Sequence, residues 1–289
     1  MKQRIYSIFL ILLMGLFAAA GLWAQSGAGA EEQPRGVIIY AAGNGFEHIR
    51  EGETREVDLS VDVAEGMELE SGDYINTYDA TFLEVQIMPS RNVLKISENT
   101  SFRVKEMEKE GGGNFELTYG RVRARVEKMA GLERFSLEGP SMVAGVRGTD
   151  FGYDIIYEND ETSAERTVAS VYCFEGEVEV RTTAEAADAL IEDSESAVVV
   201  GSEEGASEGE ETVVVIRAGE MVRLIERPVS PAEGEEPGVP EEFEVEYALI
   251  KEGMREDIRS YWERYQFMGE VMELPEEEEE EAVEVVSED

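Results

Sequence analysis

The sequence predicts an all-β protein with one amphipathic helix near its C-terminus. Short segments in which apolar and polar residues alternate recur between residues 36 and 225, and this period of two is typical of half-buried strands. Gly, Pro, Asn and Asp residues separate many of these segments and favour turns. Helical spacing of apolar residues is found only after residue 240.

The composition indicates how large a core the chain can bury and which kinds of partner it can bind. The chain has 289 residues, of which 42% are hydrophobic, and a formal net charge of -40. That length is enough for one or two domains with a buried core. The negative charge repels phosphate, so it argues against nucleic acid and anionic membrane surfaces as partners. The charge favours an interpretation as solubility or life in high salt. The alternatives are binding of basic proteins, cationic polymers or loosely held divalent cations.

Residues 1–30 are predicted to be a signal peptide. Lys2 and Arg4 precede the apolar run Ile5–Leu22, and Ala28-Gly29-Ala30 fits a cleavage site. An uncleaved membrane anchor is the alternative, because the run approaches the ~20 residues that span a bilayer. Only Met1–Arg4 precedes the run, so we expect no cytoplasmic output domain.

The predicted β domain covers residues 31–227, with its core at 66–181. The clearest alternation is at 56–63, where four apolar residues point one way. Two segments that begin with glycine, 120–126 and 176–182, share a Gly-x-Val-x-apolar pattern, which fits stacked β architectures or chance. The expected strand segments are 36–40, 56–63, 81–88, 93–96, 101–104, 114–126, 134–137, 139–155, 167–180 and 212–225.

The segments outside these strands are of three kinds. An acidic loop is expected at about 184–211, where Ser, Gly and Glu are frequent. Four prolines indicate a Pro/Glu linker at 228–242. The end of the chain, 275–289, is predicted to be a disordered acidic tail.

An amphipathic helix is predicted at 243–274, and its apolar stripe is a candidate docking surface. The stripe either packs on the chain's own β domain or binds a partner. Tyr, Trp and Met suit either role, because the aromatic residues carry a polar tip and Met adapts its shape. The candidate docking residues are Tyr247, Ile250, Met254, Ile258, Tyr261, Trp262, Tyr265 and Met268, with Met272 continuing the spacing.

Residues 66–181 resemble the FecR domain, a periplasmic module. The opening motif is "GMELESGDYINT" (66–77), followed by "VLKISENTSFRV" (93–104) and "FELTYGRVRARV" (115–126). The most specific motif is "GPSMVAGVRGTDFGYDI" (139–155). It is followed by "VYCFEGEVEV" (171–180), and "VVVIRAGEMVRL" (213–224) continues the series through Gly219-Glu220. The residues that match the family pattern are Gly72, Asp73, Thr77, Asn99, Thr100, Gly120, Arg147, Gly148, Thr149 and Gly176.

The resemblance implies a FecR-like twisted sheet or β-solenoid-like module outside the cytoplasm. We expect the matching residues to be structural, above all at the corner formed by residues 147–150. Gly148 permits a tight backbone there. Arg147 can bind carbonyls or a carboxylate at the bend, and Thr149 can bond locally. Because family members that regulate sigma factors have a cytoplasmic segment before their membrane helix, that role is not expected here.

The sequence does not predict an enzyme, a cofactor or a metal. Its single cysteine, Cys173, lies in an apolar run and suits a buried position. The single histidine, His48, lies far from it in a loop-like stretch. We therefore expect an exported, non-catalytic scaffold in the periplasm or cell envelope that binds a protein or an envelope polymer. The alternative is a membrane-anchored periplasmic sensor. Nothing in the sequence predicts the oligomeric state.

Overall fold

The structure is a computed structural model that describes residues 34–128, 135–159, 165–182, 190–191, 213–228 and 245–272. All of these residues belong to one compact unit, Pro34–Asp289. The predicted signal peptide and acidic tail lie outside the described residues. The predicted acidic loop and linker also lie outside them, except for residues 190–191 and Pro228.

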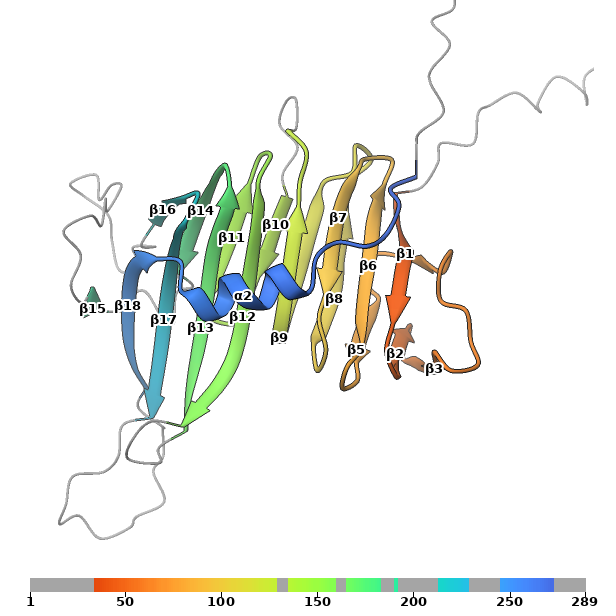
Figure 1. Cartoon of the computed structure of the whole chain (residues 1–289), viewed down its shortest axis with the longest axis horizontal. Coiled ribbons are helices and arrows are strands. Elements are labelled where there is room, and N and C mark those ends of the chain that lie inside the picture. The colour runs from red at the N-terminus through yellow and green to blue at the C-terminus, as the bar shows by residue number, and fades with distance from the viewer. Residues whose placement is uncertain are drawn as a thin grey trace, which may run out of the picture. The chain divides into compact units, whose positions relative to one another are not determined.

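The described strands form two sheets that share the long strand β9 (Gly113–Arg125) (Figure 1). Every pairing is antiparallel except β9 with β10 and β15 with β18. Sheet A contains, in spatial order, β4 (Glu68–Leu69), β1 (Arg35–Ala42), β6 (Phe82–Met88), β7 (Asn92–Ile96), β9, β12 (Asp150–Asn159), β13 (Glu165–Glu175), β17 (Glu220–Pro228), β18 (Val245–Gly253) and β15 (Leu190–Ile191). Sheet B contains β3 (Glu53–Asp58), β2 (Gly45–Arg50), β5 (Tyr74–Thr77), β8 (Ser101–Met107), β9, β10 (Phe135–Glu138), β11 (Met142–Val146), β14 (Glu177–Thr182) and β16 (Val213–Arg217).

Strand β9 passes from one sheet to the other at Gly120. Its first half pairs with β8 and β10, and its second half pairs with β7 and β12. The main core therefore lies between the sheets, with Phe102 and Phe115 contributed by sheet B and Val122 and Tyr153 by sheet A. The alternation of the sequence produces this core, since one side of each strand is apolar. The predicted all-β, twisted-sheet architecture with one C-terminal helix is confirmed.

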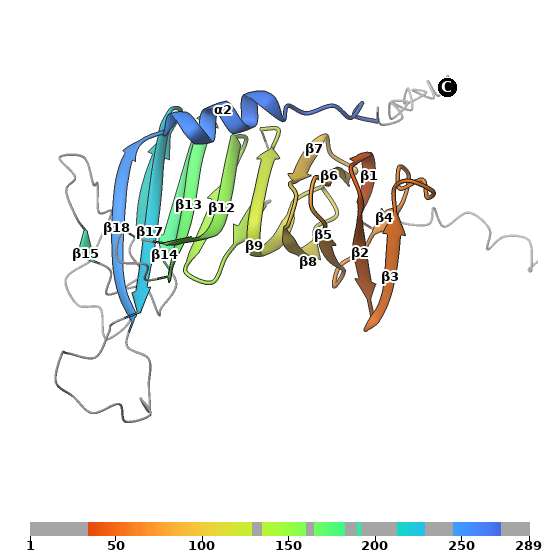
Figure 2. The same cartoon turned by 60° about the horizontal axis from the view of Figure 1, so that its bottom comes forward.

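Residues 254–272 cross the outer face of sheet A, and we call them the C-terminal strap. The strap contains helix α2 (Glu256–Arg264) followed by an extended segment (Figures 1 and 2). Met254, Ile258 and Trp262 form a second apolar cluster with Tyr172 and Met221 of the sheet. Among the described residues, no helix has the length and apolar character needed to cross a membrane.

The prediction of a helix over 243–274 is wrong in its extent. Residues 245–253 form strand β18, which pairs with β17 along its whole length. Leu249 enters the core between the sheets, while Ala248 packs on the outer face with Val168. A strand that is apolar on both faces cannot be distinguished from a helix by periodicity alone. Beyond Arg264 the chain is extended, because side chains of sheet A bind its backbone.

The strand predicted at 56–63 ends early, at Asp58. The Asp58 carboxylate accepts a hydrogen bond from the Ser60 amide at 2.9 Å, and the amides of Val61 and Asp62 donate to its carbonyl. These local bonds form a turn in place of a strand. Val61 and Val63 are consequently 78% exposed.

Candidate functional site

The signature glycines lie at corners of the fold. Gly72, Gly120, Gly148 and Gly176 have φ values of 100°, 100°, 108° and 88°, a region that favours glycine. At the corners of Gly120, Gly148 and Gly176 another backbone segment passes close by, and the contacts of Gly148 and Gly120 are the tightest. A Cβ atom on Gly148 would lie 2.7 Å from the Cα atom of Lys128, and one on Gly120 would lie 2.6 Å from that of Thr100. These two glycines permit close contact between neighbouring segments.

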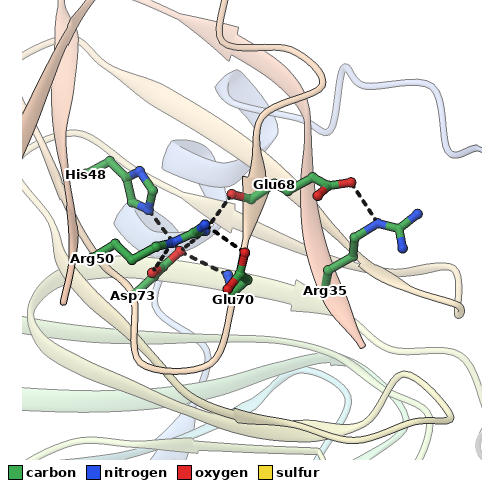
Figure 3. Close-up of polar contacts among 6 residues, drawn as sticks. All are labelled: Arg35, His48, Arg50, Glu68, Glu70 and Asp73. Carbon is green, nitrogen blue, oxygen red and sulfur yellow. Dashed lines mark hydrogen bonds and ion pairs between the residues drawn. The ribbon is translucent and has the colours of Figure 1, made fainter. Parts of the chain in front are cut away.

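Asp73 is the buried centre of a polar cluster that includes His48, Arg50 and Glu70 (Figure 3). Arg50 donates two hydrogen bonds to its carboxylate, at 2.9 and 2.7 Å. His48 Nε2 lies 2.8 Å from the same carboxylate, and the Glu70 amide donates to it at 2.9 Å. Burial alone would raise the Asp73 pKa, but the bonds from Arg50, the Glu70 amide and His48 hold it below its usual value.

This cluster connects strand β2 to the turn before β5. His48 lies on β2 and not in a loop as predicted, because β2 pairs with β5 across the intervening segment. The Asp73 side chain is only 1% exposed. Since its oxygens already accept several internal hydrogen bonds, the cluster is a structural anchor and not an open ligand site.

Thr77, Asn99 and Thr100 form a second internal junction. Thr77 Oγ1 donates to the Ser97 carbonyl at 2.5 Å and accepts from the Thr100 amide at 2.9 Å. Asn99 occupies a left-handed turn with φ of 50°, which Asn tolerates better than most residues. The junction joins β5 to the turn that precedes β8.

The corner at residues 147–150 is closed by its threonine and aspartate. Thr149 Oγ1 donates to the Glu177 carbonyl at 3.0 Å, and the Thr149 backbone exchanges two hydrogen bonds with Val126. Asp150 accepts two bonds from Arg123, at 2.8 and 2.9 Å. The bonds of Thr149 and Asp150 therefore hold this corner together, and none of the bonds described there involves Arg147.

A groove of about 790 Å³ lies beside this corner on the outer face of sheet B. The glycine positions Gly113, Gly145 and Gly148 contribute no side chain to its lining. Strands β10, β11 and β14 run side by side there, since each pairs with the next. The side chains that line the groove are Glu108, Asn114, Phe135, Ser136, Glu138, Val143, Val146, Arg147, Glu177, Glu179 and Arg181.

Arg147 is the cation of this groove that is open to a ligand. Its side chain is exposed and has no hydrogen bond or ion pair with any described residue. This differs from the expectation that it would bind a carbonyl or carboxylate at the bend. Thr149 bonds the Glu177 carbonyl there, and Arg123 bonds the Asp150 carboxylate. Arg181, the other arginine of the groove, is paired with Glu179. A free guanidinium offers five donors to a carboxylate or a carbonyl.

One acceptor beside the groove has no donor among the described residues. Asn114 Oδ1 is buried and receives no hydrogen bond from the described residues, although Asn114 Nδ2 donates to Glu138 at 2.6 Å. A buried acceptor without a donor is costly. Two carboxylates of the groove already have ion pairs. Glu138 pairs with Lys105, and Glu177 pairs with Arg217. The groove thus has one exposed donor, Arg147, and one buried acceptor that receives no hydrogen bond from the described residues.

The candidate docking residues do not form a single exposed stripe. Tyr247 and Ile250 lie on strand β18. Within the strap, Met254, Ile258 and Trp262 are buried against sheet A. Within one chain these three pack on the chain's own sheet, which is the alternative given by the sequence analysis.

The remaining candidate docking residues lie at the edge of that contact. Tyr261 contacts Ser97 and lies over Arg121, whose guanidinium carbon is 4.5 Å from the ring centre. Tyr265 stacks on Phe82 with ring centres 4.4 Å apart. Met268 alone is strongly exposed, at 64%.

The residues considered for catalysis lie in different parts of the fold. Cys173 is buried in the core on β13 of sheet A, and burial raises its pKa to about 11. His48 is bonded to Asp73 in sheet B. Within the described ranges, no group of three or more His, Cys, Asp or Glu residues could hold a metal ion.

Comparison with known proteins finds a family that matches part of the chain. Residues 73–179 match the family described as FecR protein, inside the segment 66–181 whose motifs resemble it. Two crystal structures of a candidate anti-sigma factor from Parabacteroides distasonis ATCC 8503 are similar, with 16% identity and a TM-score of 0.39. The match covers 65% of this chain and 63% of that one, which is less than two thirds of its length. None of the curated proteins matches the chain significantly.

Proposed function

Because residues 73–179 form a FecR domain, we propose that the chain is an exported, non-catalytic module that binds a protein of the cell envelope through the Arg147 groove. The observation that supports this proposal is the open donor of Arg147 in a groove of about 790 Å³. Acidic residues are in excess in the chain, yet this exposed arginine at a family-signature corner has no ion pair with any residue that the structure describes. The expected signal peptide agrees with an exported protein.

The chemistry of the groove favours a protein partner over a polysaccharide. Arg147 can donate to a carboxylate or to a peptide carbonyl, and the exposed carboxylates of Glu177 and Glu179 can accept from peptide N–H groups. A peptide segment supplies both kinds of group at every residue. The glycine at position 145 lets a backbone approach the sheet closely. An envelope polymer that carries carboxylates would satisfy Arg147 but would offer fewer N–H donors.

Crosslinking in intact cells tests this function. A photo-crosslinking residue would replace Ser136 in the groove, alone and together with Arg147→Ala. The matched control combines it with Arg55→Ala, since Arg55 is an exposed arginine of β3 that has no ion pair among the described residues. We expect a protein adduct that is retained with Arg55→Ala and lost with Arg147→Ala, while both variants keep the melting temperature of the parent.

Other results would contradict the proposal. A protein adduct that survives Arg147→Ala would show that Arg147 does not make the contact. Adducts with polysaccharide alone would replace the protein partner by an envelope polymer. The absence of any adduct in a folded, exported chain would remove the groove as a binding site.

The N-terminus of the mature protein separates this function from the anchored sensor. Export with cleavage predicts that the mature chain begins at Gln25 or Glu31, after the apolar run Ile5–Leu22. An anchored sensor would retain Met1 and remain in the membrane fraction. N-terminal sequencing of the protein from fractionated cells distinguishes these two cases.

A further inference from the structure

The C-terminal strap is bound to sheet A in the way that a peptide ligand is bound. In the described part of the chain, no strap residue pairs in a strand ladder. The last backbone bond to the sheet region joins the Met254 amide to the Gly219 carbonyl at 2.7 Å. Beyond that point the strap crosses strands β13, β12, β9, β7 and β6 (Figures 1 and 2).

Side chains of the sheet bind backbone groups of the strap. Both Glu84 oxygens accept amide hydrogens, from Met268 at 2.8 Å and from Gly269 at 2.7 Å. Lys95 Nζ donates to the Gln266 carbonyl at 2.5 Å. Gln86 both accepts from the Met272 amide, at 2.7 Å, and donates to its carbonyl, at 3.1 Å. None of these bonds depends on the strap belonging to the same chain.

The strap also shields charged side chains of sheet A from water. Glu84 is fully buried and Lys95 is 2% exposed, and the two are paired at 2.8 Å. The ring centre of Phe267 lies 4.3 Å from the guanidinium carbon of Arg125 and 5.3 Å from that of Arg123. The strap is therefore held by an apolar cluster at its helix and by polar bonds to its backbone further along. Contacts between two molecules commonly combine an apolar centre with polar bonds in this way. If the strap left, the segment best matched to this face would be the strap of another copy.

The connection between sheet and strap is short, open and extended. Gly253 ends β18, and the nearest atom to a Cβ placed there is the Gly219 carbonyl oxygen at 4.0 Å. Arg255 is extended, with φ of -66° and ψ of 146°, and gives helix α2 no side-chain cap. Rotation about these residues would direct the strap away from its own sheet without disturbing the strand pairing.

We propose that sheet A is a docking surface for the strap of a second copy, so that two chains form a dimer by reciprocal exchange of residues 254–272. The contacts made within one chain would be repeated between two, which is the usual basis of domain swapping. This surface lies on sheet A, so the proposal is independent of the groove on sheet B.

Cysteine trapping in the full mature chain tests the exchange. Phe82 and Tyr265 stack at 4.4 Å across the contact, so one variant carries Phe82→Cys and another carries Tyr265→Cys. Cys173 is buried with a pKa of about 11 and should not react. The variants would be mixed, concentrated, oxidised and separated without reductant. We expect a covalent heterodimer whose amount increases with concentration and whose linkage joins positions 82 and 265.

Two controls make either outcome informative. The double variant Phe82→Cys/Tyr265→Cys should close within a monomer when dilute, which establishes that the pair can react. A mixture of Tyr265→Cys with Arg55→Cys, placed on the distant strand β3, measures random collision. A heterodimer yield no higher than this background overturns the proposal. If the double variant does not form a disulfide, a short bismaleimide applied to the same variants gives the same comparison without requiring disulfide geometry.

Discussion

Gly120 and Gly72 share a φ of 100° but have different surroundings. A Cβ on Gly72 would meet nothing within 4 Å, whereas one on Gly120 would lie 2.3 Å from Thr100 Oγ1 and 2.6 Å from its Cα atom. We expect Gly72→Ala to lower the free energy of unfolding by about 1 kcal/mol, from left-handed strain alone. Gly120→Ala should cost about 3 kcal/mol or more, because it adds a clash with backbone. Urea unfolding of both variants checks the difference, and equal losses would contradict it.

The ionised carboxylate of Asp73 should stabilise the folded state at neutral pH. Its carboxylate accepts bonds from Arg50, His48 and the Glu70 amide, and these hold its pKa below the usual value despite burial. The stability it contributes is present above the unfolded-state pKa and is lost as the pH falls through the lower, folded-state pKa. We expect Asp73→Asn to cost about 2 kcal/mol at pH 7 and to flatten the loss of stability at acidic pH.

Thermal unfolding between neutral and acidic pH measures this effect. Glu70→Gln is the matched control, because Glu70 contacts Arg50 from an exposed position, with 58% of its side chain accessible. That variant should change stability by less than about 1 kcal/mol. If the two variants lose equal stability, the Asp73 carboxylate is not the centre of the cluster.

The sequence motifs identified the residues of these corners but not their partners. The Gly72-Asp73 pair was recognised by resemblance, yet its bonds to His48 and Arg50 depend on the pairing of β2 with β5. That pairing crosses more than twenty residues of intervening chain, and no local pattern specifies it. Likewise, only the structure shows that Thr149 bonds at its corner, whereas Arg147 makes no bond to the residues that are described.

At the scale of elements, Asp154 of β12 connects sheet A to the strap. Its carboxylate accepts from Tyr172 Oη at 2.6 Å, and Trp262 Nε1 donates to that hydroxyl at 2.5 Å. Burial raises the Asp154 pKa to about 6, although Arg121 and Tyr172 partly oppose the shift. The folded state therefore binds this proton more tightly than the unfolded state does.

The sign of the pH effect follows from that difference. Because the folded pKa of Asp154 is raised above its unfolded value, protonation as the pH falls through about 6 should stabilise the fold. Asp154→Asn has no carboxyl to titrate. We expect the stability of the parent, minus that of the variant, to increase from pH 8 to pH 5. Urea unfolding at several pH values measures it, and a flat or declining difference would contradict the raised pKa.

The strap also shows why one element was predicted poorly. Apolar residues from 247 to 272 follow helical spacing, yet only Glu256–Arg264 is helical. The first part pairs with β17, and the last part is bound by Glu84 and Gln86. In both places, contacts with distant residues outweigh a local pattern. Ile258 and Trp262, which do lie on the helix, have the burial that the pattern predicts.

At the scale of the whole described fold, alternation predicted the class of architecture but not the groove. Strands around Phe115, Val122 and Tyr153 follow directly from their period-two patterns and meet in the core. The groove requires β10 to lie parallel to β9 and β14 to pair with β11. These non-local pairings bring Asn114 and Arg147 to the same surface, and no single segment contains that information.

The net charge of -40 should make stability depend on salt. Exposed ion pairs such as Arg217 with Glu177 each contribute about 1 kcal/mol or less, and salt weakens them. Repulsion among 65 acidic residues, which only 25 basic residues offset, should outweigh these pairs. Screening length falls from about 30 Å to about 8 Å between 0.01 and 0.15 M salt. We therefore expect the melting temperature to increase mainly within that range, which calorimetry in NaCl measures.

The way the melting temperature depends on salt concentration distinguishes two explanations of the negative charge, solubility and adaptation to high salt. If the melting temperature stops increasing once the screening length is about 8 Å, ordinary salt relieves the repulsion, and the acidity does not reflect adaptation to brine. An increase that continues beyond about 1 M, where screening is already complete, would indicate adaptation to high salt. A decrease on adding salt would show that ion pairs such as Arg50 with Asp73 outweigh the repulsion.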